Sequence, residues 1–523
     1  MRHFKEYHTR WVSWKPLAPL LICLYKPAKR TLMAQYVLFS VETGGNDERF
    51  SPPRVARIDG SRSRRDERCG SVSTPARWSE LVGPGGWRES QRERMSSMHV
   101  ARTMMNQQLR RVSNEKFMAL ITSSSIGVVA LLGAQSALTS LFALLTARLL
   151  GPSDRGVVVL IATTSSLLML LGSLGVATGG RMLLSRGESS YPLGRHYRLT
   201  LRLGLVHIAT SALLGLPLLI ATHSWRGTSV GLCLIVYSVG MLVAYFERET
   251  LHGLQRHRTA ITIDLSTATV QMFGLVLLLL VHAIRLVSVL ELMSIAIWMQ
   301  VSIAVVVTRK ARRVGEERAD MMRFSKVLVL SLPALIAALA QAYVVRGDRL
   351  MLGILSDTRS VGIYGTAATI AEAIWLVPLG LSQVVFSKSA NGDVRAIARY
   401  RRISLAFSVA ASVVVVGLAP VFVKYMLGVQ YVQAVALIRL LTVAAVAMGV
   451  FFVETAVLNG QGDLKVPAKA ASAGALVMLI LCFVLIPHLG AFGAAWATVV
   501  SYALLGLLAW LAARRRLNGL LKE

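Results

Sequence analysis

The amino-acid sequence predicts an all-α polytopic membrane protein, with about 12 transmembrane helices in two six-helix lobes around a central cavity. Three observations lead to this prediction. Hydrophobic residues make up 54% of the 523 residues and charged residues 16%, whereas soluble domains contain about 25% charged residues. The hydrophobic residues are grouped in runs of about 20, the length that crosses a bilayer as a helix. Two short patterns also recur in the second half of the chain, which indicates two similar halves.

The first part of the chain, residues 1–115, differs from the rest. It is rich in Arg, Ser, Gly and Trp, and its apolar stretches at 17–25 and 32–41 are shorter than a transmembrane helix. Its basic start resembles a signal peptide, but no small-residue cleavage site follows at the expected distance. We expect a disordered extension, or sequence upstream of the true start. The methionines that would provide such a start are Met95, Met98, Met104 and Met105.

The remaining chain divides into three predicted parts. Residues 116–310 form an N-lobe, residues 311–326 a basic cytoplasmic linker, and residues 327–523 a C-lobe. Gly151 and Pro152 end the first apolar run, because proline lacks the N–H that a helix interior needs. The predicted spans are 125–150, 156–179, 199–221, 228–246, 260–283, 287–308, 327–355, 360–386, 402–422, 433–457, 466–486 and 492–513.

Lys and Arg are concentrated in every second connection between the spans, which predicts the orientation of the chain. The connections predicted to lie outside carry about one basic residue each, such as Arg155, Arg226 and Arg359. Those predicted to face the cytoplasm carry several, so both termini are predicted to be cytoplasmic. This topology accounts for the formal net charge of +30, and we expect no nucleic-acid partner. The inner basic residues include Arg195, Arg198, Arg248, Arg256, Arg258, Arg309, Lys388, Arg395 and Arg399.

Two patterns occur once in each half. The turn at 148–156, between the first two spans, has a counterpart at 349–364. The fourth span ends in Glu247-Arg-Glu-Thr-Leu-His-Gly253 and the tenth in Glu454-Thr-Ala-Val-Leu-Asn-Gly460, so Glu, Leu and Gly keep their spacing. The copies are an even number of spans apart, which predicts parallel repeats related by an axis along the membrane normal. We expect both glutamates to pair with loop arginines or to cap backbone groups; a role in ion coupling is the alternative.

Ionisable residues at membrane depth are the main candidates for a binding site, because each is costly there unless it is paired or hydrated. Arg346 and Arg349 are three residues apart and share a helix face. At about 1.5 Å per residue, Arg346 and Glu372 lie roughly 14 Å and 18 Å from the outer ends of their spans, so they are placed to meet. Either these residues form a cationic wall that binds a phosphate group, or Arg346–Glu372 and Asp348–Arg349 are internal ion pairs that fix helix packing.

Charged residues of two further spans are also candidates. Arg202 shares a helix face with Arg195 and Arg198; we expect those two to lie at the lipid headgroups and treat Arg202 as a candidate cavity residue. Asp264 and Gln271 share a face of the fifth span, and they either line the cavity or lie near the cytoplasmic interface. The candidate substrate-binding residues are therefore Arg346, Arg349, Arg202 and Glu372, and the candidate ion-coupling residues are Asp348 and Asp264.

The sequence contains no pattern that indicates an enzyme. It has no P-loop and no glycine-rich dinucleotide-binding turn. Its four cysteines show no spacing typical of metal ligands or of a disulfide framework. We therefore expect a protein that is not an enzyme and that uses no cofactor or metal.

Several stretches between about 115 and 515 are similar to one known family, in matching order and spacing. Together they resemble the bacterial polysaccharide transporters, the O-antigen and exopolysaccharide repeat-unit flippases of the multidrug/oligosaccharidyl-lipid/polysaccharide exporter superfamily. The stretches are Ala147-Arg-Leu-Leu-Gly-Pro-Ser-Asp-Arg-Gly156, Asp348-Arg-Leu-Met-Leu-Gly353 with Val361-Gly-Ile-Tyr364, Leu458-Asn-Gly-Gln-Gly462, and Leu485-Ile-Pro-His-Leu-Gly-Ala-Phe-Gly-Ala-Ala495.

The resemblance implies an alternating-access transporter in the bacterial inner membrane. It would move an undecaprenyl-diphosphate-linked oligosaccharide from the cytoplasmic to the periplasmic face, with cationic cavity residues on the diphosphate or on acidic sugars. Arg349 of the repeated hairpin is the residue carried over to that role. The implied partners are the lipid-linked oligosaccharide, membrane lipid, and the polysaccharide polymerase and glycosyltransferases of the same pathway.

Two other functions are alternatives. A drug or cation antiporter of the same superfamily would need acidic cavity residues, whereas the spans contain more Arg than Asp or Glu at membrane depth, which favours an anionic substrate. A membrane-embedded polysaccharide polymerase or ligase usually carries its catalytic groups on a long outer loop. The predicted outer loops are short, so this second alternative is less favoured.

Overall fold

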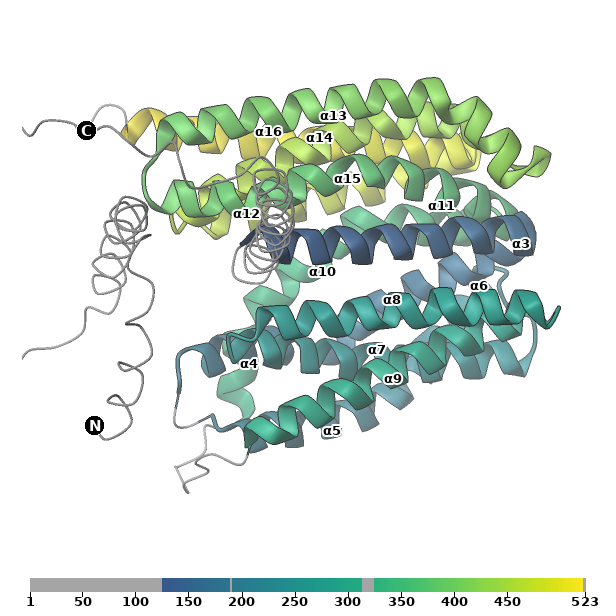
Figure 1. Ribbon diagram of the computed structural model, residues 1–523, viewed down its shortest axis with the longest axis horizontal. Helices are drawn as coiled ribbons and strands as arrows, with labels where there is room; N and C mark the ends of the chain where they lie inside the picture. The colour runs from purple at the N-terminus through teal and green to yellow at the C-terminus, as the bar shows by residue number, and fades with distance from the viewer. Residues whose placement is uncertain (1–124, 189–190, 313–323, 521–523) are drawn as a thin grey trace, which may run out of the picture. The chain divides into compact units, whose positions relative to one another are not determined.

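The computed structural model describes residues 125–188, 191–312 and 324–520, and these residues form helices joined by short connections (Figure 1). The predicted extension at 1–115 and most of the predicted linker at 311–326 lie outside the described residues. In chain order the helices are α3 Ser125–Ser173, α4 Val176–Ser185, α5 Leu193–Thr210, η1 Ser211–Gly215, α6 Leu216–Ala221, α7 Thr228–Gly253, α8 His257–Leu280, α9 Leu286–Arg312, α10 Phe324–Leu355, α11 Thr358–Glu372, η2 Ala373–Trp375, α12 Leu376–Ala390, α13 Val394–Phe422, η3 Val423–Leu427, η4 Val429–Tyr431, α14 Ala434–Gly460, α15 Lys465–Leu489 and α16 Ala491–Leu520.

Eleven of the described helical segments are long and apolar enough to cross a membrane. The first of them, Ala130–Ser173, contains Gly151, whose φ of 75° and ψ of 173° interrupt the helix. Only glycine adopts such a backbone readily, and Pro152 follows it, so this segment comprises two consecutive helices. The described residues therefore contain twelve spans, which confirms the predicted number.

Several spans differ in detail from the prediction, and three of them illustrate how. The second span, predicted at 156–179, breaks at Gly175, which has a φ of 72°, and the chain continues as the separate helix α4. The third begins at Leu193 instead of 199, because a helix continues into the basic residues beyond the apolar run that marks the bilayer core. The eighth is interrupted by the 3₁₀-helix η2.

The helices pack in two groups that correspond to the two halves of the chain. In the first half α7, α8 and α9 contact one another, and with α3 they enclose an apolar core that includes Leu234 and Val289. In the second half α14 contacts α11, α12, α13 and α16, and α15 packs on α16. Figure 1 shows α7, α8 and α9 side by side, with α13, α14 and α16 in a second group. This arrangement is the predicted pair of helical lobes.

Helices α3, α10 and α11 join the two groups. The backbones of α3 and α11 cross at two glycines of the repeated turn. A Cβ added at Gly156 would lie 1.7 Å from the carbonyl oxygen of Thr358, and one added at Gly362 would lie 1.9 Å from that of Pro152. Helix α10 contacts α4 in the first half and α15 in the second. Small residues let membrane helices approach this closely, so the repeated turn has a packing role.

Candidate functional site

A cavity of about 400 Å³ lies among α3, α7, α8, α9 and α10, and we refer to it as the central cavity. It is therefore bounded by helices of the first half and by the first helix of the second half. Its lining mixes apolar side chains with tyrosines, amides, hydroxyls and charges. The charged and amide residues that line it are Gln135, Arg248, Asp264, Gln271, Gln300 and Arg346.

Asp264 is the acidic residue of the central cavity, and neighbouring side chains hold its carboxylate. Gln300 Nε2 donates a hydrogen bond to Asp264 Oδ1 at 2.6 Å, and Thr267 Oγ1 donates to Gln300 Oε1 at 2.8 Å. Arg248 Nη1 lies 3.9 Å from Asp264 Oδ2. Two positions were left open for Asp264 and Gln271, and the structure shows the first: both residues line the central cavity.

The sequence analysis missed Arg248 as a cavity residue, although a signal was present. Arg248 and Asp264 lie at similar distances on either side of the short connection between α7 and α8. Two residues at equal depth on adjacent antiparallel helices are placed to meet. Arg248 was assigned to the inner loop, so its closeness to Asp264 was not recognised. In the structure α7 continues to Gly253, and Arg248 lies inside this helix.

Arg346 reaches the central cavity from α10. Among the described residues, no carboxylate lies within ion-pair distance of its guanidinium; Glu372, the predicted partner, accepts a hydrogen bond from Arg349 Nη2 instead. The alternative that these residues form internal ion pairs therefore named the wrong arginine: Glu372 pairs with Arg349 and not with Arg346. Depth counted along separate helices ignores their tilt, and an error of one helical turn exchanges residues three positions apart.

Asp348 belongs to a second, tightly bonded cluster in the second half. Its carboxylate is buried and accepts hydrogen bonds from the Tyr364 hydroxyl at 2.5 Å, from Thr498 Oγ1 at 3.1 Å and from the backbone N–H of Arg349 at 2.7 Å. The Asp348–Arg349 side-chain pair, which was part of the same alternative, is not formed among the described residues: the Arg349 guanidinium pairs with Glu372, and only its backbone N–H binds Asp348. We refer to Asp348, Arg349, Glu372, Tyr364 and Thr498 as the second-half cluster.

The cavity beside the second-half cluster measures only about 20 Å³. A space of this size holds about one water molecule. The cluster therefore leaves no room for a diphosphate or a sugar. Of the residues that the sequence put forward, Arg346 and Asp264 line the central cavity. Arg349 and Glu372 pair with each other, and Asp348 accepts hydrogen bonds within the second-half cluster.

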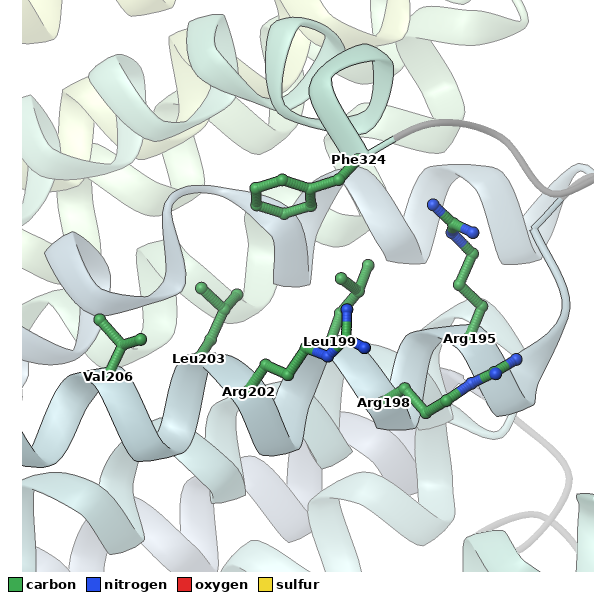
Figure 2. Close-up of a pocket in the computed structure, with 7 residues that line it drawn as sticks. All are labelled: Arg195, Arg198, Leu199, Arg202, Leu203, Val206 and Phe324. Carbon is green, nitrogen blue, oxygen red and sulfur yellow. The ribbon is translucent and has the colours of Figure 1, made fainter.

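Arg202 lies neither in the central cavity nor in the second-half cluster. With Arg195 and Arg198 it lines a groove along α5, opposite Phe324 at the start of α10 (Figure 2). None of the residues that line this groove also lines the central cavity. A shared helix face was predicted correctly for the three arginines, but the face alone does not say which neighbouring helix it meets.

The glutamates of the repeated pattern are both buried and have different partners. Glu454 forms an ion pair with Arg401, one of the two kinds of contact expected. Glu247 Oε2 accepts hydrogen bonds from Thr308 Oγ1 at 2.9 Å and from the Tyr197 hydroxyl at 3.3 Å. The two copies therefore fix helix packing through different donors.

Hydrogen bonds between the two halves close the end of the molecule that contains the turn at 148–156, and we refer to this end as the hairpin end. Arg148 Nη1 donates to the backbone oxygens of Tyr425 at 2.6 Å and Met426 at 2.8 Å. The Tyr431 hydroxyl donates to the backbone oxygen of Ala147 at 2.9 Å. Burial raises the pKa of Tyr431 to about 12, so this hydroxyl keeps its proton at neutral pH. Under the predicted orientation, the closed end is the outer one.

Arg155 completes this closed end and was expected in an outer loop. Its side chain is only 6% exposed, and Nη1 donates to Thr146 Oγ1 at 3.1 Å. The chain turns at Gly151, between the two residues, which brings them together. The sequence showed a basic residue in a short connection, and packing of the halves buries it.

No protein-family model and no curated protein matches the sequence. Several solved structures share its fold. An inward-facing multidrug resistance MATE family transporter of the MOP superfamily superposes with a TM-score of 0.59 at 13% identity, over 76% of this chain and 99% of that chain. The lipid II flippase MurJ, in an inward closed conformation, superposes with a TM-score of 0.60 at 14% identity, over 74% of this chain and 87% of that chain.

An outward-facing MATE family transporter of the same superfamily gives a lower TM-score of 0.54 at 14% identity, over 76% of this chain and 96% of that chain. At these identities the likeness establishes the fold alone: the chain has the fold of these transporters.

Proposed function

We propose that this protein is an alternating-access flippase of the bacterial inner membrane. It moves an undecaprenyl-diphosphate-linked oligosaccharide, an O-antigen or exopolysaccharide repeat unit, from the cytoplasmic to the periplasmic face. The observation that carries the proposal is the central cavity, into which α10 places Arg346 without a carboxylate partner among the described residues. Similarity in fold to a lipid II flippase supports this class of activity.

The charges of the central cavity favour an anionic ligand. Arg248 lies beside Asp264, which offsets its charge, and Arg346 adds a further positive charge. A guanidinium presents five N–H donors in a planar fork that matches phosphate oxygens. The amides of Gln135 and Gln271 offer both donors and acceptors to sugar hydroxyls. We therefore assign the diphosphate to Arg346 and the first sugars to the amide-lined part.

Transport requires the two lobes, at 116–310 and 327–523, to rock about the bound headgroup while the polyprenyl tail stays in lipid. The bonds of Arg148 and Tyr431 hold the hairpin end closed, which is the inward-facing state under the predicted orientation with cytoplasmic termini. Opening outward breaks these bonds. The substrate drives the change only to the extent that it binds the two states with different affinity. Polysaccharide polymerase and glycosyltransferases would use and supply the substrate.

The experiment uses the full chain in liposomes that contain the lipid-linked oligosaccharide, and it measures how fast the glycan becomes accessible to a lectin on the far side. We expect the protein to accelerate this step. The change Arg346→Gln should slow it about tenfold or more, because a hydrogen bond to a charged group contributes about 1.5–3 kcal/mol. The control is Arg399→Gln, which removes the same charge from an exposed position on α13. A wild-type rate in Arg346→Gln would contradict the proposal.

One observation favours a second function, a drug or cation antiporter of the same fold. Asp264 places a carboxylate in the central cavity, where it would attract a cation or bind a proton. In the same liposomes, uptake of a cationic dye driven by a proton gradient tests this function. Dye uptake that Asp264→Asn abolishes, together with no acceleration of glycan flipping, would establish the antiporter and exclude the flippase.

A further inference from the structure

The groove along α5 has the features of a ligand site distinct from the central cavity. Its volume is about 440 Å³, and its lining comes from α5 and from Phe324, the first residue of α10. Figure 2 shows Arg195, Arg202, Leu203 and Val206 along one helix, with the Phe324 ring reaching over from the other side. Spacings of three and four residues place these side chains on one stripe of α5.

The charge of this α5 groove is entirely positive. Arg195, Arg198 and Arg202 line it, and no acidic residue is among the lining residues. The Nε of Arg195 is buried and has no hydrogen-bond partner in the described part of the chain. Three guanidinium groups within two helical turns attract an anion, and a phosphate group can accept several of their hydrogen bonds.

The apolar part of the α5 groove identifies the kind of anion. Leu199 and Leu203 form a buried floor, and the groove continues past the arginines to Val206, which is 62% exposed. Phe324 is 38% exposed on the opposite side. A soluble phosphate would leave this surface uncovered. A phospholipid would cover it with acyl chains while its phosphate contacts the arginines, as basic residues at the cytoplasmic interface do with anionic lipids.

We propose that the α5 groove binds an anionic phospholipid of the cytoplasmic leaflet, such as phosphatidylglycerol. The phosphate lies at Arg195, Arg198 and Arg202, and one acyl chain lies between Leu203 and Phe324. Because α5 belongs to the first half and α10 opens the second, the bound lipid touches both halves. Its occupancy is therefore coupled to their relative position, since a ligand favours the state that it binds better. This inference does not rest on the proposed substrate.

The test uses the purified full chain, stripped of lipid and titrated with phosphatidylglycerol or phosphatidylcholine of the same acyl chains. Native mass spectrometry measures the Kd of the first bound lipid. We expect the wild type to prefer phosphatidylglycerol. The single change Arg202→Gln should weaken its binding about fivefold, since one arginine near an anionic lipid contributes about 1 kcal/mol. Replacing Arg195, Arg198 and Arg202 together by glutamine should abolish the preference.

The matched control replaces Arg395, Arg399 and Arg402 by glutamine. These three arginines have nearly the same spacing on α13, and their side chains are exposed. The control should keep the wild-type Kd for the first phosphatidylglycerol. Equal binding of the two lipids, or equal losses in the two triple variants, would overturn the proposal. A groove that takes undecaprenyl diphosphate but shows no preference for phosphatidylglycerol would also overturn it, and would mark a substrate entry site instead.

Discussion

The two halves of the molecule use their buried charges in different ways. In the second half, Arg349 and Glu372 pair, and Asp348 accepts three hydrogen bonds beside a cavity of about 20 Å³. In the first half, Asp264 and Arg248 face a cavity of about 400 Å³, which Arg346 of α10 also lines. The charges of the second-half cluster have partners and almost no free space around them, whereas Arg248, Asp264 and Arg346 line an open cavity, in which Arg346 has no carboxylate partner among the described residues.

This difference distinguishes charges that stabilise the fold from charges that are available to bind a ligand. A charge inside a membrane protein is costly unless it is paired or hydrated, and removing one partner of a buried pair leaves the other uncompensated. We therefore expect changes in the second-half cluster to lower stability and leave ligand affinity unchanged. Changes at Arg346 should lower ligand affinity and leave stability unchanged. The following predictions test this comparison, in order of their expected effect on stability.

The largest loss of stability is expected for Glu372→Ala. This change leaves the Arg349 guanidinium, whose side chain is 11% exposed, without its carboxylate. The expected cost is about 3 kcal/mol, the lower end of the range for breaking a buried pair. Thermal unfolding of the detergent-purified protein, followed by circular dichroism, measures it as a lower Tm.

The control for Glu372→Ala removes both charges. The double variant Glu372→Ala with Arg349→Met should recover most of the lost Tm, because a buried ion pair can often be replaced by apolar residues at little cost. If Glu372→Ala alone left the Tm unchanged, the pair would have no structural role, and the contrast between the two halves would fail.

A smaller effect is expected for Tyr364→Phe. This change removes the hydroxyl that donates to Asp348 Oδ2 at 2.5 Å and leaves a buried carboxylate with one donor fewer. The expected cost is about 1–3 kcal/mol, again measured as a lower Tm. The control Tyr400→Phe removes a hydroxyl from a partly buried tyrosine that packs on another core, and it should change the Tm little. Equal Tm values for the two variants would show that the Asp348 bond contributes nothing.

The sequence predicted the arrangement of the spans better than the pairing of charges. The length of the apolar runs and the repeated turn are local properties, so they indicated twelve spans, and Gly151 marks the turn within the first long segment. Pairing depends on helix tilt and on which faces meet, and neither is encoded locally. For this reason the alternative of internal ion pairs matched Glu372 with Arg346 when it binds Arg349, and Arg202, a candidate for the cavity, lines the α5 groove.

The bonds that close the hairpin end could not be predicted from the sequence either. Arg148 lies in a repeated turn, but its bonds go to backbone oxygens almost 280 residues later in the chain, at Tyr425 and Met426. Backbone oxygens have no signature in the sequence. The proposed alternation between two conformations would require two sets of such contacts, which one sequence must permit. The glycines at which α3 and α11 cross could be identified in the sequence, whereas the hydrogen bonds that hold the hairpin end closed could not.

The most direct test of the contrast between the two regions measures ligand affinity in both. The purified full chain is titrated with undecaprenyl diphosphate, and the Kd is compared between Arg346→Gln and the double variant Glu372→Ala with Arg349→Met. We predict that Arg346→Gln weakens binding about tenfold with little change in Tm, because its loss removes a charged hydrogen bond to the ligand and no internal pair. The double variant should bind as the wild type does. A wild-type Kd in Arg346→Gln together with a weakened Kd in the double variant would contradict the account and place the anion site at the second-half cluster.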